Sequence, residues 1–230
     1  MGLSEEQFKR MTEAWNFSNL HLRYEWEDLT DVSEVVKQEL RTYISDFTLK
    51  KSVVFERFKS GTPPGILLYS HQTGTAKTVL INLLAKELVL ANKGIRKMLY
   101  LQGVEMFNEL KRMFRPEGGL ISSDLLEHII TSDVFFLDDF DKLLRWSPWE
   151  KEQGTLIIDK CYTSMKPLII TANRTFQEMA EHPQIKLEQH LLSRLSQMCK
   201  VIHIDTKQDF RLSQSKVSSL KIKKDRKFVI

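Results

Sequence analysis

The stretch GILLYSHQTGTAKT, residues 65–78, joins a short apolar run to a small polar loop, and a long helical pattern follows at residues 79–92. Strand, loop and helix in this order are the context of a phosphate-binding loop, because loop N–H groups and the helix N-terminus then face one anion. In such a loop Lys77 reaches the β- and γ-phosphates of a nucleotide, and the Thr78 hydroxyl binds Mg²⁺. The predicted nucleotide contacts of the loop are Gly74, Thr75, Ala76, Lys77 and Thr78.

Two positions of this loop depart from the strict phosphate-loop pattern G-x-x-x-x-G-K-[ST]. His71 and Ala76 stand where the pattern has glycine, and Gly74 is the glycine that is left between them. Glycine serves positive φ angles and close approach of the backbone to a ligand, so each added side chain bears on loop geometry or phosphate clearance. Taken alone, the loop leaves open whether a bound nucleotide is hydrolysed.

A second motif supports the phosphate loop. The run VFFLDD, residues 134–139, is an apolar strand that ends in two carboxylates, and Asp138 follows Lys77 by 61 positions. This is the Walker B arrangement, in which Asp138 holds the Mg²⁺ shell and Asp139 orients and deprotonates the attacking water. A strand followed by acidic turn residues is the alternative interpretation.

Three further polar residues are candidates to complete a nucleotide site. Asn173 follows the apolar run LIITA, where its amide could hold the water or the γ-phosphate, although a turn asparagine is the simpler explanation of this residue alone. Arg194 lies in a helical pattern before the last strand, either as a surface ion-pair partner or as an arginine finger for a neighbouring subunit. Arg211 is a second cation late in the chain.

Short apolar runs alternate with helical patterns along the body of the chain, which predicts βαβ units and a parallel sheet covered on both faces. The predicted strands are residues 65–70, 97–103, 133–140, 166–173 and 200–205. The helices predicted among them are residues 79–92, 105–114, 122–131, 148–165, 175–182 and 187–199. The expected fold class is therefore α/β.

The chain divides into three predicted parts. Residues 1–45 form a helical N-terminal extension, with Ser4 and Asp31 as possible N-caps, that either packs onto the body or docks a partner. Residues 46–212 form the nucleotide-binding domain, and residues 213–230 form a basic tail in which six Lys or Arg side chains accompany one Asp. Such a tail either binds nucleic-acid phosphates through counterion release or is a solvated appendage.

Composition restricts the class of protein. The 230 residues are 42% apolar and 28% charged, which is typical of a globular chain with a sizeable core. No apolar run reaches the ~18 residues of a membrane span, and the N-terminus lacks the hydrophobic segment of a secretory signal. Cys161 and Cys199 are too few for a disulfide framework or a cysteine-rich zinc site. We therefore expect reduced, buried cysteines in a cytoplasmic protein without a membrane segment.

These segments, in this order, resemble the AAA+ ATPases of the DnaC/DnaI helicase-loader and IstB transposition-helper family. The resemblance covers roughly residues 22–212 and includes YEWEDL, GILLYSHQTGTAKT, VFFLDDF, PLIITAN, LLSRLSQMCKVIHI and DFR. Paired aspartates together with PLIIT-x-N and SRL are a more specific combination than the phosphate loop. The replaced glycines depart from the family pattern, as does a short N-terminal part without the cysteine cluster of some loaders.

The resemblance implies family roles for residues already singled out: Walker A for Lys77 and Thr78, Walker B for Asp138 and Asp139, sensor 1 for Asn173, the arginine finger for Arg194 and sensor 2 for Arg211. It also implies a three-layer P-loop sandwich of the ASCE type with five parallel strands, ATP and Mg²⁺ as ligands, and a homo-oligomeric ring or spiral with ATP at its subunit interfaces. Loaders of this family bind a replicative DnaB-type helicase through the N-terminal segment and single-stranded DNA through the ATPase body.

Three functions are compatible with these features. The first is an ATP-dependent helicase loader with slow, Mg²⁺-dependent turnover. The second is an IstB-like transposition helper ATPase, which would bind duplex DNA and a transposase instead. The third is a scaffold of a replication complex that binds a partner without hydrolysing nucleotide, and it is motivated by His71 and Ala76 in the phosphate loop.

Overall fold

The computed structural model describes residues 4–7, 9, 25–91, 94–106, 108, 122–143, 147–183 and 186–206. Within these residues lies a sheet of five parallel strands in the order β2-β3-β4-β1-β5. The strands are β1 (Gly65–Tyr69), β2 (Met98–Gln102), β3 (Val134–Asp138), β4 (Leu168–Ala172) and β5 (Cys199–His203). The prediction of an α/β fold with a five-stranded parallel sheet is confirmed.

The strand order decides which loops meet. β4 lies between β1 and β3, so the turn with Asn173 separates the phosphate loop from the paired aspartates. All three segments follow the carboxyl ends of parallel strands and therefore open at the same edge of the sheet. Ligands of open α/β sheets bind at this edge.

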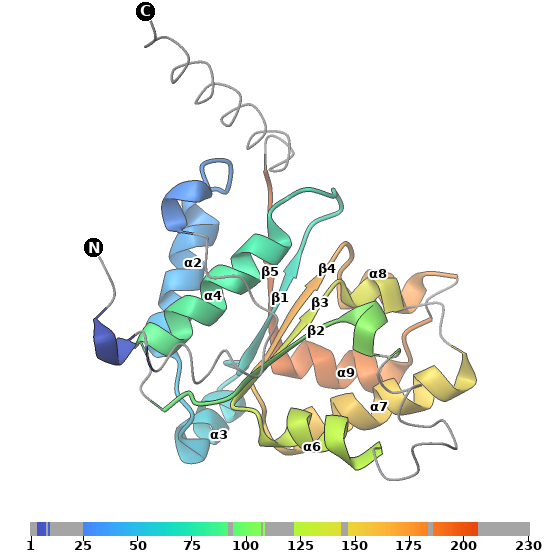
Figure 1. Ribbon diagram of the computed structural model, residues 1–230. Coiled ribbons are helices and arrows are strands. Elements are labelled where there is room, and N and C mark those ends of the chain that lie inside the picture. The colour runs from blue at the N-terminus through green and yellow to red at the C-terminus, as the bar shows by residue number, and fades with distance from the viewer. Residues whose placement is uncertain are drawn as a thin grey trace, which may run out of the picture.

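Helices cover both faces of the sheet, and the molecule has the three layers that we expect of a P-loop sandwich (Figure 1). One face is covered by α2 (Glu34–Asp46) and α4 (Lys77–Ala91). The other face is covered by α6 (Ser122–Thr131), α7 (Pro148–Thr163), α8 (Phe176–Glu181) and α9 (Gln189–Met198). A further helix, α3 (Lys51–Lys59), precedes β1 near the amino ends of the strands.

Alternation along each strand divides the core into two clusters. Ile66 and Leu68 pack toward α2 and α4, whereas Leu67 packs toward the opposite helices. In β3, Phe136 belongs to the first cluster and Phe135 to the second, and all five side chains are 0% exposed. Complete burial of such a side chain contributes about 1.5–3 kcal/mol. Since both faces are covered, the strands read in the sequence as unbroken apolar runs.

The segment from Glu25 to the end of α2 packs onto the body. Leu29, Val36 and Leu40 belong to the same core cluster as α4, and α2 packs against α4. The Glu25 carboxylate forms an ion pair with Lys86 of α4. Residues 25–46 therefore belong to the core of the α/β body.

One N-cap prediction in this extension is wrong and one is confirmed. Asp31 does not cap the following helix, because the Ser33 hydroxyl lies directly before the first turn and accepts a hydrogen bond from the Val36 N–H at 3.3 Å. Ser4 does act as a cap, since its hydroxyl accepts from the Gln7 N–H at 3.2 Å.

No helix in the described ranges combines the length and the hydrophobicity of a membrane span. Cys161 and Cys199 are free and buried, as predicted, and burial raises the pKa of the Cys161 thiol to about 12. The predicted helix at residues 105–114 falls mostly outside the described residues.

Candidate nucleotide-binding site

The loop between β1 and α4 contains two residues in the left-handed backbone region. Gly74 has a φ of 74° and Ala76 has a φ of 62°. Ala76 thus adopts the conformation for which the strict pattern uses glycine, and its Cβ costs about 1 kcal/mol there. The loop therefore has a positive φ angle at the position of the second glycine although alanine replaces it.

A run of backbone donors in this loop lacks protein acceptors. Among the described residues, none accepts a hydrogen bond from the N–H groups of residues 73–78. These groups belong to the loop and to the first turn of α4, where helical N–H groups have no intrahelical partner. Consecutive free donors at a helix N-terminus form a concave anion site.

Lys77 is held inside the loop. Its Nζ donates to Gln72 O at 2.9 Å, to Thr75 Oγ1 at 3.2 Å and to Ser70 O at 3.4 Å. Burial lowers the pKa of this lysine, while the nearby carboxylates that follow β3 act in the opposite direction. The ammonium group is therefore positioned by neutral loop oxygens, which a phosphate oxygen can replace.

Asp138 is the centre of a buried hydroxyl network. Its Oδ2 accepts from Thr78 Oγ1 and from the Tyr100 hydroxyl, both at 2.9 Å, and its Oδ1 accepts from the Thr171 hydroxyl. Asp138 is 1% exposed, and three donors offset part of the cost of burying its charge. The contact with Thr78 brings the two predicted Mg²⁺ ligands together.

Asp139 turns out of the strand through a strained backbone. Its φ is 55°, and its N–H is anchored on Thr171 Oγ1 at 2.8 Å. A non-glycine residue in this region costs about 1–3 kcal/mol and persists only where its surroundings hold it. The Asp139 carboxylate forms an ion pair with Lys142 Nζ at 2.6 Å through Oδ2, so one of its two oxygens is engaged.

Asn173 is fastened to the turn after β3. Its N–H and its Nδ2 donate to Asp141 Oδ1 at 3.0 and 3.3 Å, and the Asp141 side chain is 2% exposed. The other carboxylate oxygen of Asp141 pairs with Arg174 at 3.3 Å. The structure thus joins the turn after β4 to the short helix η3 (Phe140–Leu143).

His71, the larger departure from the loop pattern, is held outside the donor run. Its Nε2 lies 2.8 Å from Glu178 Oε1 of α8. The ring also meets the rings of Tyr69 at 5.6 Å and His203 at 6.3 Å, at the ends of β1 and β5. The imidazole is thus held by α8 and the strand ends rather than by residues 73–78.

Arg194 lies apart from the phosphate loop. Its guanidinium forms an ion pair with Asp159 of α7 and stands 5.8 Å from the centre of the Tyr162 ring. Within one subunit it is the surface ion-pair partner that we gave as an alternative. Arg211 and the tail at residues 213–230 lie outside the described residues.

Six residues that support the site had no predicted role: Tyr100, Asp141, Lys142, Thr171, Arg174 and Glu178. A polar residue within an apolar run was an available signal for Thr171, which is 0% exposed. Asp141 read only as an acidic turn residue. Tyr100 offered no signal, because tyrosine is common in strands.

The residues present fit a magnesium nucleotide. Mg²⁺ prefers oxygen ligands and retains waters and phosphate oxygens, so one or two protein side chains are enough to hold it. Thr78 and Asp138 provide these oxygens, and residues 73–78 provide phosphate donors. In the part of the chain that the structure describes, no group of three or more His, Cys, Asp or Glu forms a metal cage.

Sequence comparison finds limited similarity. No protein-family model matches the chain. The uncharacterised protein YqaM of Bacillus subtilis (strain 168) is 27% identical over 150 residues. The match covers 64% of this chain and 44% of the length of YqaM.

Solved structures match more of the chain. The DnaC helicase loader has a TM-score of 0.59 at 19% identity, over 88% of this chain and 100% of the other. The replication initiator DnaA bound to AMPPCP and single-stranded DNA has a TM-score of 0.52 at 18% identity, over 76% of this chain and 56% of the other. At these identities the similarity shows the fold. The chain has the AAA+ P-loop fold that the replication proteins DnaC and DnaA share.

Proposed function

We propose that this protein is an ATP-binding replication helicase loader, which assembles on single-stranded DNA and delivers a DnaB-type replicative helicase. Nucleotide binding is supported by groups that meet at one edge of the sheet. The N–H groups of residues 73–78 have no acceptor among the described residues, the Lys77 ammonium lies in the same loop, and Thr78 Oγ1 lies 2.9 Å from Asp138 Oδ2. The replication role is supported by the fold, because structures with this fold include the DnaC helicase loader and a DnaA that holds AMPPCP and single-stranded DNA.

Nucleotide binding uses groups that already face the loop. The N–H groups of residues 73–78 donate to phosphate oxygens, and Lys77 exchanges the Gln72 carbonyl for a phosphate. Thr78 and Asp138 hold Mg²⁺, which neutralises phosphate charge when bound. Hydrogen bonds from the Tyr100 and Thr171 hydroxyl groups hold the Asp138 carboxylate in place.

Hydrolysis, in this proposal, is slow. Asp139 orients and deprotonates the attacking water, and Asn173 steadies the γ-phosphate or the water from the neighbouring strand end. Because one oxygen of the resting Asp139 carboxylate is engaged with Lys142 at 2.6 Å, occupancy by ATP rather than rapid turnover is the state that the site favours.

Assembly would complete the site. We propose homo-oligomers in which Arg194 leaves Asp159 and enters the neighbouring subunit's site as an arginine finger, with Arg211 as a second phosphate contact. Mixing Arg194→Ala with Lys77→Ala subunits should then partly restore phosphate release, since one interface combines the two intact halves. Co-assembled mixtures without rescue would argue against a shared site.

Two other functions are alternatives. The Asp139–Lys142 ion pair favours a nucleotide-binding scaffold that does not hydrolyse ATP. An IstB-like transposition helper would use the same site with a transposase and duplex DNA as partners. Phosphate release with and without single-stranded DNA tests the scaffold, because a scaffold binds ATP without turnover.

Calorimetric titration with ATP and ADP in the presence of Mg²⁺ tests the core of the proposal. The parent protein should bind both, and Lys77→Ala should bind about 10- to 100-fold more weakly, as expected for a lost hydrogen bond from a charged group. Lys200→Ala, which removes an exposed lysine from β5, is the control and should bind like the parent. Unchanged affinity in Lys77→Ala would remove this lysine from the site.

Partner capture distinguishes the two DNA-related roles. A DnaB-type helicase retained by the immobilised protein in an ATP-dependent manner supports loading, whereas retention of a transposase supports the alternative.

Deletion of residues 216–230 should weaken binding to single-stranded DNA and flatten its dependence on salt. An unchanged salt dependence would identify the tail as a solvated appendage.

A further inference from the structure

His71 makes a contact that glycine at this position does not allow. Its Nε2 lies 2.8 Å from Glu178 Oε1, although the two residues are far apart in the chain. The His71 side chain is 57% exposed and that of Glu178 is 42% exposed, so the contact can form or break without unfolding the protein. The first residue of the phosphate loop is thereby connected to α8.

The second oxygen of Glu178 continues this connection. Glu178 Oε2 accepts from the Thr175 N–H at 2.7 Å and from the Thr175 hydroxyl at 3.0 Å, and together these residues form the capping box of α8. Burial alone would raise the pKa of Glu178, but the hydrogen bonds from Thr175 and His71 outweigh it and lower the pKa. Glu178 is thus a carboxylate with one oxygen for the helix cap and one for the phosphate loop.

The N-cap of α8, Thr175, is also the last residue of the turn that follows β4. Thr175 follows Asn173 and Arg174 directly, and both of these residues are held by Asp141. A continuous series of hydrogen bonds therefore runs from the loop at His71 through Glu178 to this turn. Movement of the loop on binding a ligand would be transmitted to Asn173 along this path.

We propose that His71 is a positioning residue that couples the phosphate loop to the turn carrying Asn173 and Arg174 through Glu178. The inference rests on the proposed binding of nucleotide. Protonation of the imidazole turns a hydrogen bond into an ion pair and places a positive charge beside the loop. Acidification that protonates this imidazole is therefore expected to increase the affinity for a polyanionic nucleotide.

The groups that contact the ring come from three elements. Glu178 of α8 provides the carboxylate, and the rings of Tyr69 from β1 and His203 from β5 face the imidazole. Lys77 is the charged side chain of the loop itself. His203 is a second imidazole against this ring, so its contribution requires a variant of its own.

Calorimetric titration with Mg²⁺ and ATP on the full chain, from about pH 5.5 to about pH 8, tests the coupling. The variants are His71→Gly, Glu178→Gln and the double variant, and glutamine at position 178 preserves the helix cap. We expect the parent to gain about two- to fivefold in affinity relative to His71→Gly over this range, the scale of an exposed ion pair. Protonation of ATP itself cancels in this ratio, and the double variant should match His71→Gly.

Matched controls separate the pair from other histidines. His190 lies 3.3 Å from Glu188, and these side chains are 44% and 50% exposed, so His190→Gln removes a similar pair elsewhere. His190→Gln and His203→Gln should both retain the affinity gain of the parent. An affinity that rises on acidification as steeply in His71→Gly as in the parent, but not in His203→Gln, would overturn the assignment.

Hydrogen–deuterium exchange gives a second readout. Binding of ATP should protect the amides of both the loop and residues 173–178 in the parent, but only those of the loop in His71→Gly. Equal protection of the turn in both proteins, or an affinity ratio independent of pH, would overturn the coupling and leave nucleotide binding intact. Failure of the parent to bind ATP at any pH would overturn the proposed function together with this inference.

Discussion

The two edges of the sheet follow opposite designs. At the amino edge, side chains satisfy backbone carbonyls: the Tyr43 hydroxyl donates to Pro64 O at 2.8 Å, and Lys166 Nζ donates to Ile130 O at 3.0 Å. At the carboxyl edge, residues 73–78 keep N–H groups without an acceptor among the described residues. Carbonyl groups at the amino edge thus have hydrogen-bond donors within the protein, whereas N–H groups at the carboxyl edge remain available to a ligand.

Positive φ angles occur at both edges of the sheet. Gly74, Ala76 and Asp139, with φ angles of 74°, 62° and 55°, follow carboxyl ends of strands, whereas Gly61 at 80° and Met165 at 49° precede the amino ends of β1 and β4. Such strain is retained where the surrounding structure over-determines it. Donors without acceptors among the described residues, rather than positive φ angles, therefore distinguish the carboxyl edge from the amino edge.

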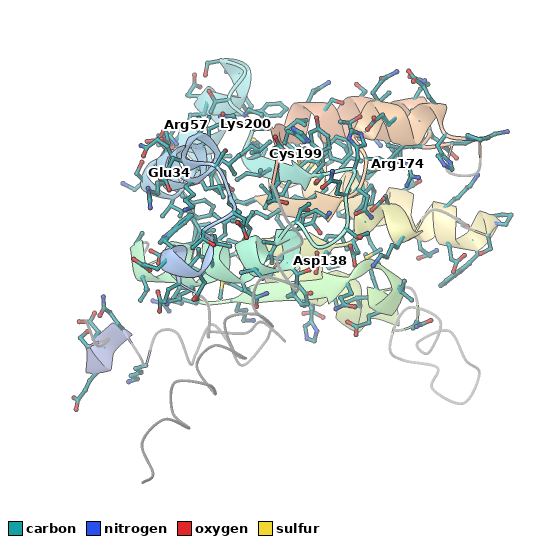
Figure 2. All side chains as sticks on the ribbon, turned by 90° about the horizontal axis from the view of Figure 1, so that it is seen from above. Glu34, Arg57, Asp138, Arg174, Cys199 and Lys200 are labelled. Atoms are coloured by element: carbon teal, nitrogen blue, oxygen red, sulfur yellow. The ribbon has the colours of Figure 1, made fainter. Side chains whose placement is uncertain are left out.

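Cavity size does not make this distinction. A cavity of about 140 Å³ lies at the amino edge, and its lining includes Tyr43, Arg57 and Lys200. Figure 2 shows Arg57 and Lys200 of this cavity apart from Arg174, which follows the carboxyl end of β4. The polar groups of this cavity are paired internally, Arg57 with the Asp46 carbonyl and Lys200 with Glu39 at 3.3 Å. Because Arg57 and Lys200 are already paired, this cavity offers a ligand fewer free hydrogen-bond donors than the loop at residues 73–78.

The largest stability effect is expected at the amino edge, from Gly65→Ala. A Cβ at this position would lie 2.2 Å from Leu168 O, so β1 or β4 must shift. We expect a loss of about 3 kcal/mol or more in the free energy of unfolding, measured by urea denaturation. Gly61→Ala is the control, because it meets no atom within 4 Å and bears only the strain of a φ of +80°, about 1 kcal/mol. Equal losses in the two variants would contradict the clash.

The largest activity effect is expected at the carboxyl edge, from Asp139→Asn. Removal of the proposed base should lower phosphate release about 100-fold and leave the affinity for ATP unchanged. Asp133→Asn is the matched control, since Asp133 lies at the other edge and accepts from the N–H groups of Arg96 and Lys97 at 2.7 and 2.9 Å. This control should lose stability without losing turnover. The same rate in Asp139→Asn and the parent would refute the role of Asp139.

Two tyrosines compare the edges directly. Tyr100 donates to the Asp138 carboxylate at 2.9 Å, and Tyr43 donates to a neutral carbonyl at 2.8 Å. Burial raises the pKa of both phenols, so both are neutral donors at ordinary pH. Tyr100→Phe should cost about 1.5–3 kcal/mol of unfolding free energy, and Tyr43→Phe about 1 kcal/mol, because hydrogen bonds to charged groups are stronger. A larger loss from Tyr43→Phe would reverse this comparison.

The smallest effect is expected from Ala76→Gly, which restores the glycine of the strict pattern. Glycine relieves the strain at a φ of 62°, and the net gain in unfolding free energy should be about 0.5–1 kcal/mol with no loss of affinity for ATP. Ala85→Gly, in the interior of α4, should instead cost about 1 kcal/mol. Destabilisation by Ala76→Gly would mean that the methyl group is needed for packing.

Most of the fold could be predicted from periodicity. Each predicted strand overlaps an observed one, because strands buried on both faces show as apolar runs. The structure brings Lys77, Thr78 and Asp138 together as the motifs predicted. It gives Arg194 a partner on its own subunit, an outcome between alternatives that the sequence pattern did not decide.

The sequence by itself determined the alternation of strands and helices and the spacing of the motif residues, since both follow from local pattern and chain order. The tertiary structure alone decided which side chains complete the site. Tyr100 and Asp141 reach Asp138 and Asn173 from other loops and strands, because the order β3-β4-β1 brings distant segments to one edge. It also decided that His71 meets Glu178, a contact between residues too distant in the chain for any local pattern to predict.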